Sequence, residues 1–212
     1  MRDIPMFTTE NGVASLFLKK IPFTKEAFVL IRDSLSCAAL VKECIDVCHM
    51  AGAEKIYAAG HDELACYPFV CSVLRFCVSK KHLPDTQSVA LPVTIEQMEW
   101  WRKLYNQKMA SVQTASPLSA ADAEELILSG KAFYICSECA ILGIGVAYEE
   151  KIHAIASVMP GAGRDTLLAL SKCLQSTVIS LSVASTNEKA LRLYKSLGFA
   201  ETEMEMNWYQ IY

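Results

Sequence analysis

The chain has 212 residues, of which 52% are hydrophobic and 20% charged, and its formal net charge is −3. This composition is that of a globular protein with ample material for a core, and near-neutrality without a Lys/Arg block excludes a basic phosphate-binding surface. We therefore expect no nucleic-acid partner. No apolar run is long enough to cross a bilayer, and the N-terminus lacks the layout of a signal peptide. A cytoplasmic protein without membrane contact is expected.

Nine cysteines are an unusually high number. Without a secretory signal they are expected to be reduced thiols that pack like small apolar side chains. Cys37, Cys44 and Cys48 are spaced at whole helical turns, which predicts one buried helix face. Cys136 and Cys139 form a CxxC between two strand candidates, but no second pair accompanies them. We predict no metal site.

The first segment, to about residue 81, has an order of its own, and polar residues 80–87 with Pro84 form a boundary. This predicts domains at 1–85 and 86–212. Apolar periodicity and turn residues predict the following elements: strands 13–18 and 26–31, a helix 36–51 ended by Gly52, a strand 54–59, a short helical turn 62–66 and a strand 72–79.

The second segment begins at about Leu91 and alternates helices with strands in a different proportion. The expected elements are helices 96–109 and 120–128, strands 132–136, 141–148 and 152–158, a helix 166–174, a strand 177–183, a helix ending before Gly198 and a final strand 199–212. Ser119 and Asp122 are expected to cap the second helix. This order predicts an α/β fold with a mixed sheet and helices on both faces.

The stretch 181–199 has the best-determined local structure. Ser185 and Glu188 have the spacing of a capping box, and Gly198 supplies the left-handed residue that ends a helix. Between them, four residues recur at i, i+3, i+4 and i+7 and predict one apolar helix face: Ala190, Leu193, Tyr194 and Leu197.

This stretch resembles the second signature motif of the GNAT superfamily of acyl-CoA N-acyltransferases. The matching positions are Leu181, Val183, Asn187, Ala190, Leu193, Tyr194, Gly198 and Phe199. The resemblance implies a GNAT-like fold in which acetyl-CoA lies where this strand splays from its neighbour. It further implies that Asn187 lies near the pantetheine arm and that Tyr194 protonates the departing thiolate. From the residues alone, one Tyr on an amphipathic helix also fits ordinary packing.

The N-terminal segment repeats the element order of the C-terminal half with little residue identity. Two interpretations stay open: a degenerate, shortened GNAT-like half, as in tandem members of the superfamily, or an unrelated small α+β layer. The segment could cap the acceptor site or mediate a homodimer.

A second motif runs from a strand through a glycine-containing loop into a helix. Free amides at a helix N-terminus bind anions, which suits the pyrophosphate of CoA. The expected cofactor-binding residues are Val158, Met159, Gly161, Ala162, Gly163, Arg164, Asp165 and Thr166. The loop departs from the family pattern, because no Arg or Gln stands three residues before the first glycine and it is shorter than usual. A shortened loop of this kind is consistent with weaker CoA binding or with a family member that has lost catalysis.

Acyl transfer to an amine needs a polarised carbonyl, a base and an acid. By resemblance, the amide near Val158 or Met159 binds the thioester oxygen and Tyr194 is the acid. The candidate bases are His153, which precedes Val158 on the same strand, and Glu150, with Glu138 in a neighbouring turn. The glutamates also fit solvated turns and the histidine a structural role.

An aromatic cluster, Trp100, Trp101 and Tyr105, fits either an acceptor site or core packing. The function predicted is an N-acetyltransferase that moves an acetyl group from acetyl-CoA to the amine of an unidentified small molecule or peptide, without a metal. The alternative is a catalytically silent GNAT-like module that binds CoA or has a structural role. A GNAT fold using another acyl donor has no residue that favours it.

Overall fold

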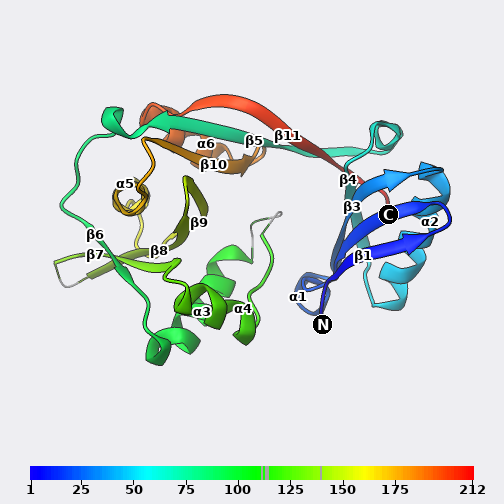
Figure 1. Cartoon of the computed structure of the whole chain (residues 1–212), viewed down its shortest axis with the longest axis horizontal. Helices are drawn as coiled ribbons and strands as arrows, with labels where there is room; N and C mark the ends of the chain where they lie inside the picture. Colours follow the sequence, from blue (N-terminus) through cyan, green and yellow to red (C-terminus); the bar gives the residue numbers. More distant parts are fainter. Residues whose placement is uncertain (111, 113–114, 139) are drawn as a thin grey trace. The chain divides into compact units, whose positions relative to one another are not determined.

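The computed structural model describes residues 1–110, 112, 115–138 and 140–212. By its internal contacts it divides into two compact units, shown within the whole chain in Figure 1. Unit 1 comprises Met1–Val73 and Met204–Tyr212, and unit 2 comprises Leu74–Glu203. Within the described residues, the strands form one mixed sheet with the order β1-β2-β3-β4-β11-β5-β10-β9-β8-β7-β6. Two long strands, β5 (Phe69–Ser79) and β11 (Ala200–Gln210), contribute residues to both units.

Unit 1 is built on an antiparallel meander followed by a parallel crossover. Its elements are β1 (Ile4–Thr9), β2 (Gly12–Phe17), α1 (Ile21–Thr24), β3 (Glu26–Ser34), α2 (Cys37–Met50), β4 (Lys55–Ala59) and the 3-10 helix η1 (Asp62–Cys66). β1, β2 and β3 pair antiparallel in succession, and β4 returns parallel to β3 after α2. This connection is the usual way to join parallel neighbours.

The predicted cysteine stripe forms the buried face of α2. Cys37, Cys44 and Cys48 are buried in the core of this unit together with Leu40 and Val41. Burial raises the pKa of Cys44 to about 12 and that of Cys48 to about 11, so both remain thiols at neutral pH. These cysteines therefore pack as apolar side chains, as expected.

Unit 2 places helices on both faces of its strands. Its elements are η2 (Lys80–His82), β6 (Val89–Pro92), η3 (Ile95–Gln97), α3 (Met98–Met109), α4 (Ala120–Leu128), β7 (Ala132–Ser137), β8 (Ala140–Tyr148), β9 (Lys151–Ser157), α5 (Gly163–Cys173), β10 (Val178–Ala184) and α6 (Glu188–Ser196). α5 and α6 pack in one core with Phe133, Ile135 and Leu181, whereas α3 and α4 pack in another with Tyr134 and Ile144. Successive side chains of β7 therefore point alternately into the two cores. The helices on both faces of the sheet confirm the predicted α/β class.

The two halves share one element order more closely than the sequence indicated. β1-β2-β3-α2-β4-η1-β5 corresponds to β7-β8-β9-α5-β10-α6-β11. β1 was not predicted from the sequence, so the predicted N-terminal segment had one strand too few. β1 was missed because its residues are mostly exposed or half-buried and include Pro5, so no alternating pattern is visible.

Two glycines of β8 allow α5 to lie close to the sheet. A Cβ on Gly143 would stand 2.5 Å from both Cγ2 and Oγ1 of Thr166, and one on Gly145 would stand 2.3 Å from Cδ1 of Leu170. No real side-chain atom tolerates such distances without a shift. The two glycines therefore set the position of α5, whose N-terminus belongs to the candidate site.

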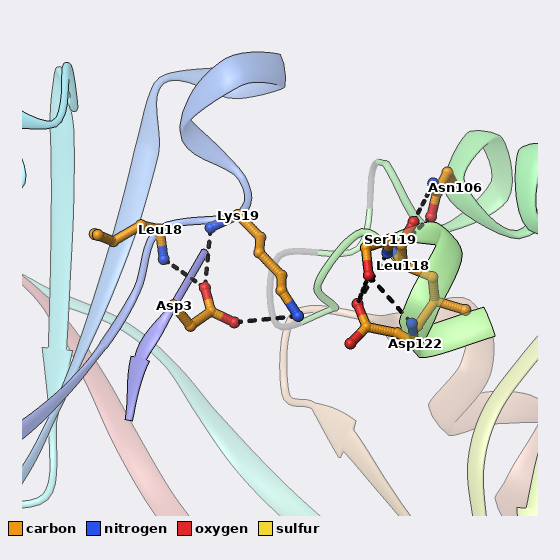
Figure 2. A network of polar contacts seen from close by, with 7 residues as sticks. All are labelled: Asp3, Leu18, Lys19, Asn106, Leu118, Ser119 and Asp122. Carbon is orange, nitrogen blue, oxygen red and sulfur yellow. Dashed lines mark hydrogen bonds and ion pairs between the residues drawn. The ribbon is translucent and has the colours of Figure 1, made fainter. Parts of the chain in front are cut away.

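Polar contacts fix loops in each unit, as Figure 2 shows. In unit 1, Oδ1 of Asp3 accepts from the amides of Leu18 and Lys19 at 2.8 and 3.0 Å. In unit 2, Ser119 caps α4 through the predicted capping box with Asp122, and Asn106 holds both the amide and the carbonyl of Leu118. Among the described residues, no helix is both long and apolar enough to span a membrane.

Candidate functional site

The parallel strands β9 and β10 are joined by two register pairs near the start of β9. The pairs are Ser180 with Lys151 and Leu181 with Ile152, which lie in the middle of β10. The part of β9 beyond Ile152 lies outside this register, and we call this part of its edge the opening. The resemblance implies a splay of the strands at this edge.

Backbone groups of β9 point into this opening. The amide of Val158 donates to the carbonyl of Leu142 on β8, so the backbone at this position faces β8. Because successive backbone groups of a strand alternate in direction, Ile155 and Ser157 direct their amides and carbonyls away from β8, toward the opening. An extended ligand would find strand-like hydrogen-bonding partners there.

A β-bulge marks the closed end of the opening. Val146 pairs with Ala154 and Ala147 pairs with Ile152, so His153 is the extra residue of β9. The imidazole of His153 is exposed and stacks on the ring of Tyr148, with centroids 3.8 Å apart. Partial desolvation, followed by the charge of Lys151, lowers its pKa below the ordinary value, so the neutral ring is favoured at neutral pH.

At the other end, the loop after β9 leads directly into α5. The helix begins at Gly163, its N-cap is Ala162, and no side chain caps it. The amides of its first turn, which include Gly163 and Arg164, lack partners inside the helix by the geometry of any α-helix. Gly161 is exposed, has φ +82°, and has nothing within 4 Å of the place of a Cβ. The loop is therefore open at Gly161.

The start of α5 lies against both β9 and α6. A Cβ on Gly163 would stand 3.2 Å from Cδ2 of Leu193 and 3.3 Å from Oγ of Ser157. The first turn of α5 therefore lies close to the carboxyl end of β9 and to α6. The predicted glycine loop and the signature helix thus lie side by side.

Three residues of the predicted loop have roles other than those expected. The amides of Val158 and Met159 both donate to the carbonyl of Leu142, at 2.8 and 3.2 Å, so neither is free to bind a thioester oxygen. Thr166 is fully buried, and its amide and hydroxyl both donate to the carbonyl of Ala162. The correction follows from register and burial, which the loop sequence does not reveal.

Asp165 is half-buried in the first turn of α5. Its Oδ1 accepts a hydrogen bond from the hydroxyl of Thr86 at 3.2 Å. A carboxylate stabilises a helix N-terminus but competes there with a bound phosphate. Arg164, the neighbouring cation, is exposed.

The start of α6 differs from the expected capping box. Its N-cap is Asn187, whose Oδ1 accepts from the amide of Ala190 at 3.2 Å, so Ser185 does not begin the helix. The correction has a local reason, because Asn at an N-cap reaches the N3 amide as well as Ser does. Asn187 therefore orients α6, whatever it does for a ligand.

Tyr194 lies on the buried face of α6. Its ring packs near Phe76 and Phe199, with centroids 6.5 and 6.0 Å away, in the same core as Ile152 and Leu181 at the closed end of the opening. Burial raises its pKa to about 12, so the phenol keeps its proton at neutral pH. A protonated phenol is the form that an acid needs.

The remaining candidate residues lie at opposite ends of the strands. Glu150 is exposed at the turn into β9, three residues before His153, and its carbonyl accepts from the amide of Ser180 at 2.8 Å. Glu138 is exposed at the β7–β8 turn, which lies at the opposite, phosphate-loop end of these strands. Cys139 of the CxxC lies outside the described residues. Cys136 is half-buried, and burial raises its pKa.

The aromatic cluster of α3 is mostly core. Trp101 is fully buried and donates from Nε1 to the carbonyl of Phe133 at 3.3 Å, and Tyr105 is also buried. Burial raises the pKa of Tyr105 to about 12. Trp100 is 52% exposed and is the member of the three with surface to offer an acceptor.

The corresponding strands of unit 1 have no such opening. β3 and β4 pair over the whole length of β4, from Glu26 with Lys55 to Leu30 with Ala59. Gly60 then continues so near to β3 that a Cβ on it would stand 2.3 Å from the carbonyl of Ile31. The repeat in unit 1 thus has the same element order, but the register of its parallel pair continues over the whole of β4.

No family model and no curated protein matches the sequence. Solved structures match over most of the chain. They include GCN5-related N-acetyltransferases from Sphaerobacter thermophilus (9% identity, TM-score 0.56, covering 93% of this chain and 75% of that one) and from Anabaena variabilis (9%, 0.61, 94% and 59%). A tandem GNAT protein from the clavulanic acid biosynthesis pathway matches at 11% identity and a TM-score of 0.52, over 94% of this chain and 78% of its own.

Together with the splayed strands and the glycine loop, these likenesses define the class of fold. The chain has the fold of the GNAT acetyltransferases.

Proposed function

We propose that this protein is an N-acetyltransferase that transfers an acetyl group from acetyl-CoA to an amine, and that unit 2 carries the reaction. The observation that supports this best is the edge of β9 beyond Ile152, which begins at the bulge of His153 and ends at the start of α5, where no side chain caps the helix. Unit 1 lacks this opening in its described strands, so one acetyl-CoA per chain is expected.

In this proposal each part of the opening binds one part of the cofactor. The pyrophosphate lies at Gly161, Gly163 and Arg164, where the helix dipole and the guanidinium favour a negative charge. The pantetheine arm runs along Ile155 and Ser157, whose backbone groups point into the gap. The thioester then lies near the bulge, and Asn187 fixes the helix on the far side.

The reaction proceeds by attack of the neutral amine on the thioester carbon, which forms the C–N bond and breaks the C–S bond. The ammonium proton passes to a base, and the thiolate receives a proton from the phenol of Tyr194. We assign the base to His153, because its neutral ring is favoured at neutral pH and it lies at the closed end of the opening. Glu150, three residues before His153, is the alternative base.

Calorimetric titration with acetyl-CoA tests the binding part. We expect one site per chain and a loss of roughly fivefold in affinity for Arg164→Ala, which corresponds to about 1 kcal/mol for one charge at a helix N-terminus. Arg75→Ala, which removes an exposed arginine paired with Glu203, is the matched control and keeps full affinity. The absence of binding at millimolar acetyl-CoA by a folded protein would exclude the enzyme.

A second candidate is a silent module that binds CoA without catalysis. The carboxylate of Asp165 in the first turn of α5 favours it, because that charge opposes a phosphate at the same place. The two functions differ in turnover. Release of free CoA with a panel of primary amines supports the enzyme, whereas tight binding with no thiol release from any amine supports the module.

A further inference from the structure

Unit 1 contains a cluster of potential metal ligands far from the opening between β9 and β10 in sequence. Sγ of Cys37, a ring nitrogen of His61 and a carboxylate oxygen of Glu63 all lie within 4.8 Å of one another. Cys37 is buried, His61 is half-buried and Glu63 is exposed, so the cluster extends from the core to the surface. Among the described residues it is the one group of three such ligands at this spacing.

Separate structural elements hold the three side chains in place. Cys37 is the first residue of α2, and Glu63 lies in the first turn of η1. His61 follows Gly60, whose φ of +97° and close approach to the carbonyl of Ile31 leave room for glycine alone. The loop between β4 and η1 is therefore pinned to β3, and His61 is directed toward the start of α2.

The three side chains are of the types that bind a divalent cation. Sulfur, imidazole and carboxylate are the ligands that zinc binds in proteins. A divalent cation would join the three side chains in one centre.

We propose that Cys37, His61 and Glu63 bind one zinc-class divalent cation, which ties the start of α2 to the loop after β4. In a tetrahedral zinc site, sulfur and nitrogen ligands stand about 3.5 Å apart, given Zn–S and Zn–N bonds of about 2.3 and 2.0 Å. The observed spacing of up to 4.8 Å therefore needs a contraction of about 1 Å. The exposed side chain of Glu63 and the half-buried ring of His61 can supply it by rotation.

The imidazole of His61 accepts one hydrogen bond, which affects the nitrogen at which a metal can bind. Its Nδ1 accepts from the amide of Glu63 at 3.3 Å, a long contact. A cation bound at Nδ1 would replace the hydrogen bond from the Glu63 amide. A cation bound at Nε2 would instead replace the proton on that nitrogen. In both cases the thiol of Cys37 gives its proton to solvent, as thiolate ligation requires. The site is structural and does not depend on acetyl-CoA or on any residue of unit 2.

The test uses the full chain, reduced and freed of metal with a chelator. Zinc is titrated against a chromophoric competitor, bound metal is counted by elemental analysis, and cobalt replaces zinc to give a thiolate-to-cobalt charge-transfer band. We expect one zinc per chain, a higher unfolding temperature with zinc, and at least tenfold weaker binding for Cys37→Ser, His61→Gln and Glu63→Gln. Cys77→Ser and His82→Gln, a cysteine and a histidine of unit 2, are the matched controls and bind as the parent does.

Three results would overturn the proposal. They are no zinc above a trace in the parent protein, a cobalt complex without a thiolate band, and equal losses in the ligand and control variants. Because Cys37 is buried, Cys37→Ser could unfold unit 1. Glu63→Gln changes an exposed side chain and keeps the test decisive, since circular dichroism verifies its fold.

Discussion

Replacing Gly143 by alanine should destabilise unit 2 and displace the start of α5. The new Cβ would stand 2.5 Å from two side-chain atoms of Thr166 and 2.8 Å from the carbonyl oxygen of Ala156. Neither obstacle can move easily. Thr166 is fully buried with its hydroxyl bonded to Ala162 at 2.7 Å, and Ala156 belongs to the paired part of β9. The helix must therefore shift away from the sheet.

The magnitude follows from these contacts. Overpacking of a well-packed core costs about 1–3 kcal/mol. With three contacts below 3.0 Å, all of them on groups that are held in place, we place Gly143→Ala near about 3 kcal/mol. For a chain of this length each kcal/mol lowers the melting temperature by about 2–4 °C, so a fall of roughly 6–12 °C is expected.

Thermal and urea unfolding, followed by circular dichroism, measure this loss. Gly163→Ala is the matched control, because its Cβ would meet only side-chain ends at 3.2 and 3.3 Å and alanine is the better helix residue, so its stability should stay within about 1 kcal/mol. Adding Thr166→Ala to Gly143→Ala should recover at least about 1 kcal/mol as coupling between neighbours. A loss below about 1 kcal/mol for Gly143→Ala, or no coupling, would refute the argument from close packing.

Three further predictions concern the candidate site. Asn187→Ala should cost about 1 kcal/mol in urea unfolding through loss of the helix cap. Tyr194→Phe should keep acetyl-CoA affinity but lower kcat about 10²-fold, and the parent pH profile should show no loss of acid below about pH 10, since the pKa of Tyr194 is raised to about 12. His153→Gln should lower kcat/KM about 10²-fold and abolish an acidic limb centred below the ordinary histidine pKa. Because the folded-state pKa of His153 is lowered, the unfolded chain takes up its proton first, and this residue should reduce stability as pH falls below about 6.5.

Local patterns in the sequence were sufficient for elements that bury one clear face. The stripe of α2, the capping box of Ser119 and the helix before Gly198 were all predicted from spacing, and each is present. β1 and β6 were missed because an exposed or irregular edge strand carries little alternation. The helix cap was placed at Ser185 because two polar residues near a helix start give the same pattern, and only the backbone decides between them.

Pairing between strands determines the candidate site, and the sequence could not show it. The amides of Val158 and Met159 resemble free loop donors in the sequence, but the register of β8 directs both to Leu142. The bulge at His153 likewise depends on the register between β8 and β9, in which β9 has one extra residue. In unit 1, a helix and a strand separate Cys37 from His61 in the sequence, so no short motif indicates the proposed metal-binding site.

The two repeats show how one element order can serve two purposes. A parallel pair that stays bonded along its whole length, as β3 and β4 do, satisfies its backbone groups internally and leaves none for a ligand. In β9 the extra residue at His153 follows directly on the last paired residue, Ile152, and beyond it the backbone of Ile155 and Ser157 must find other partners. Burial without a partner would be costly, so an opening of this kind is stable only where water or a bound molecule completes the hydrogen bonds. This requirement, rather than the element order alone, is the reason for assigning acetyl-CoA to unit 2.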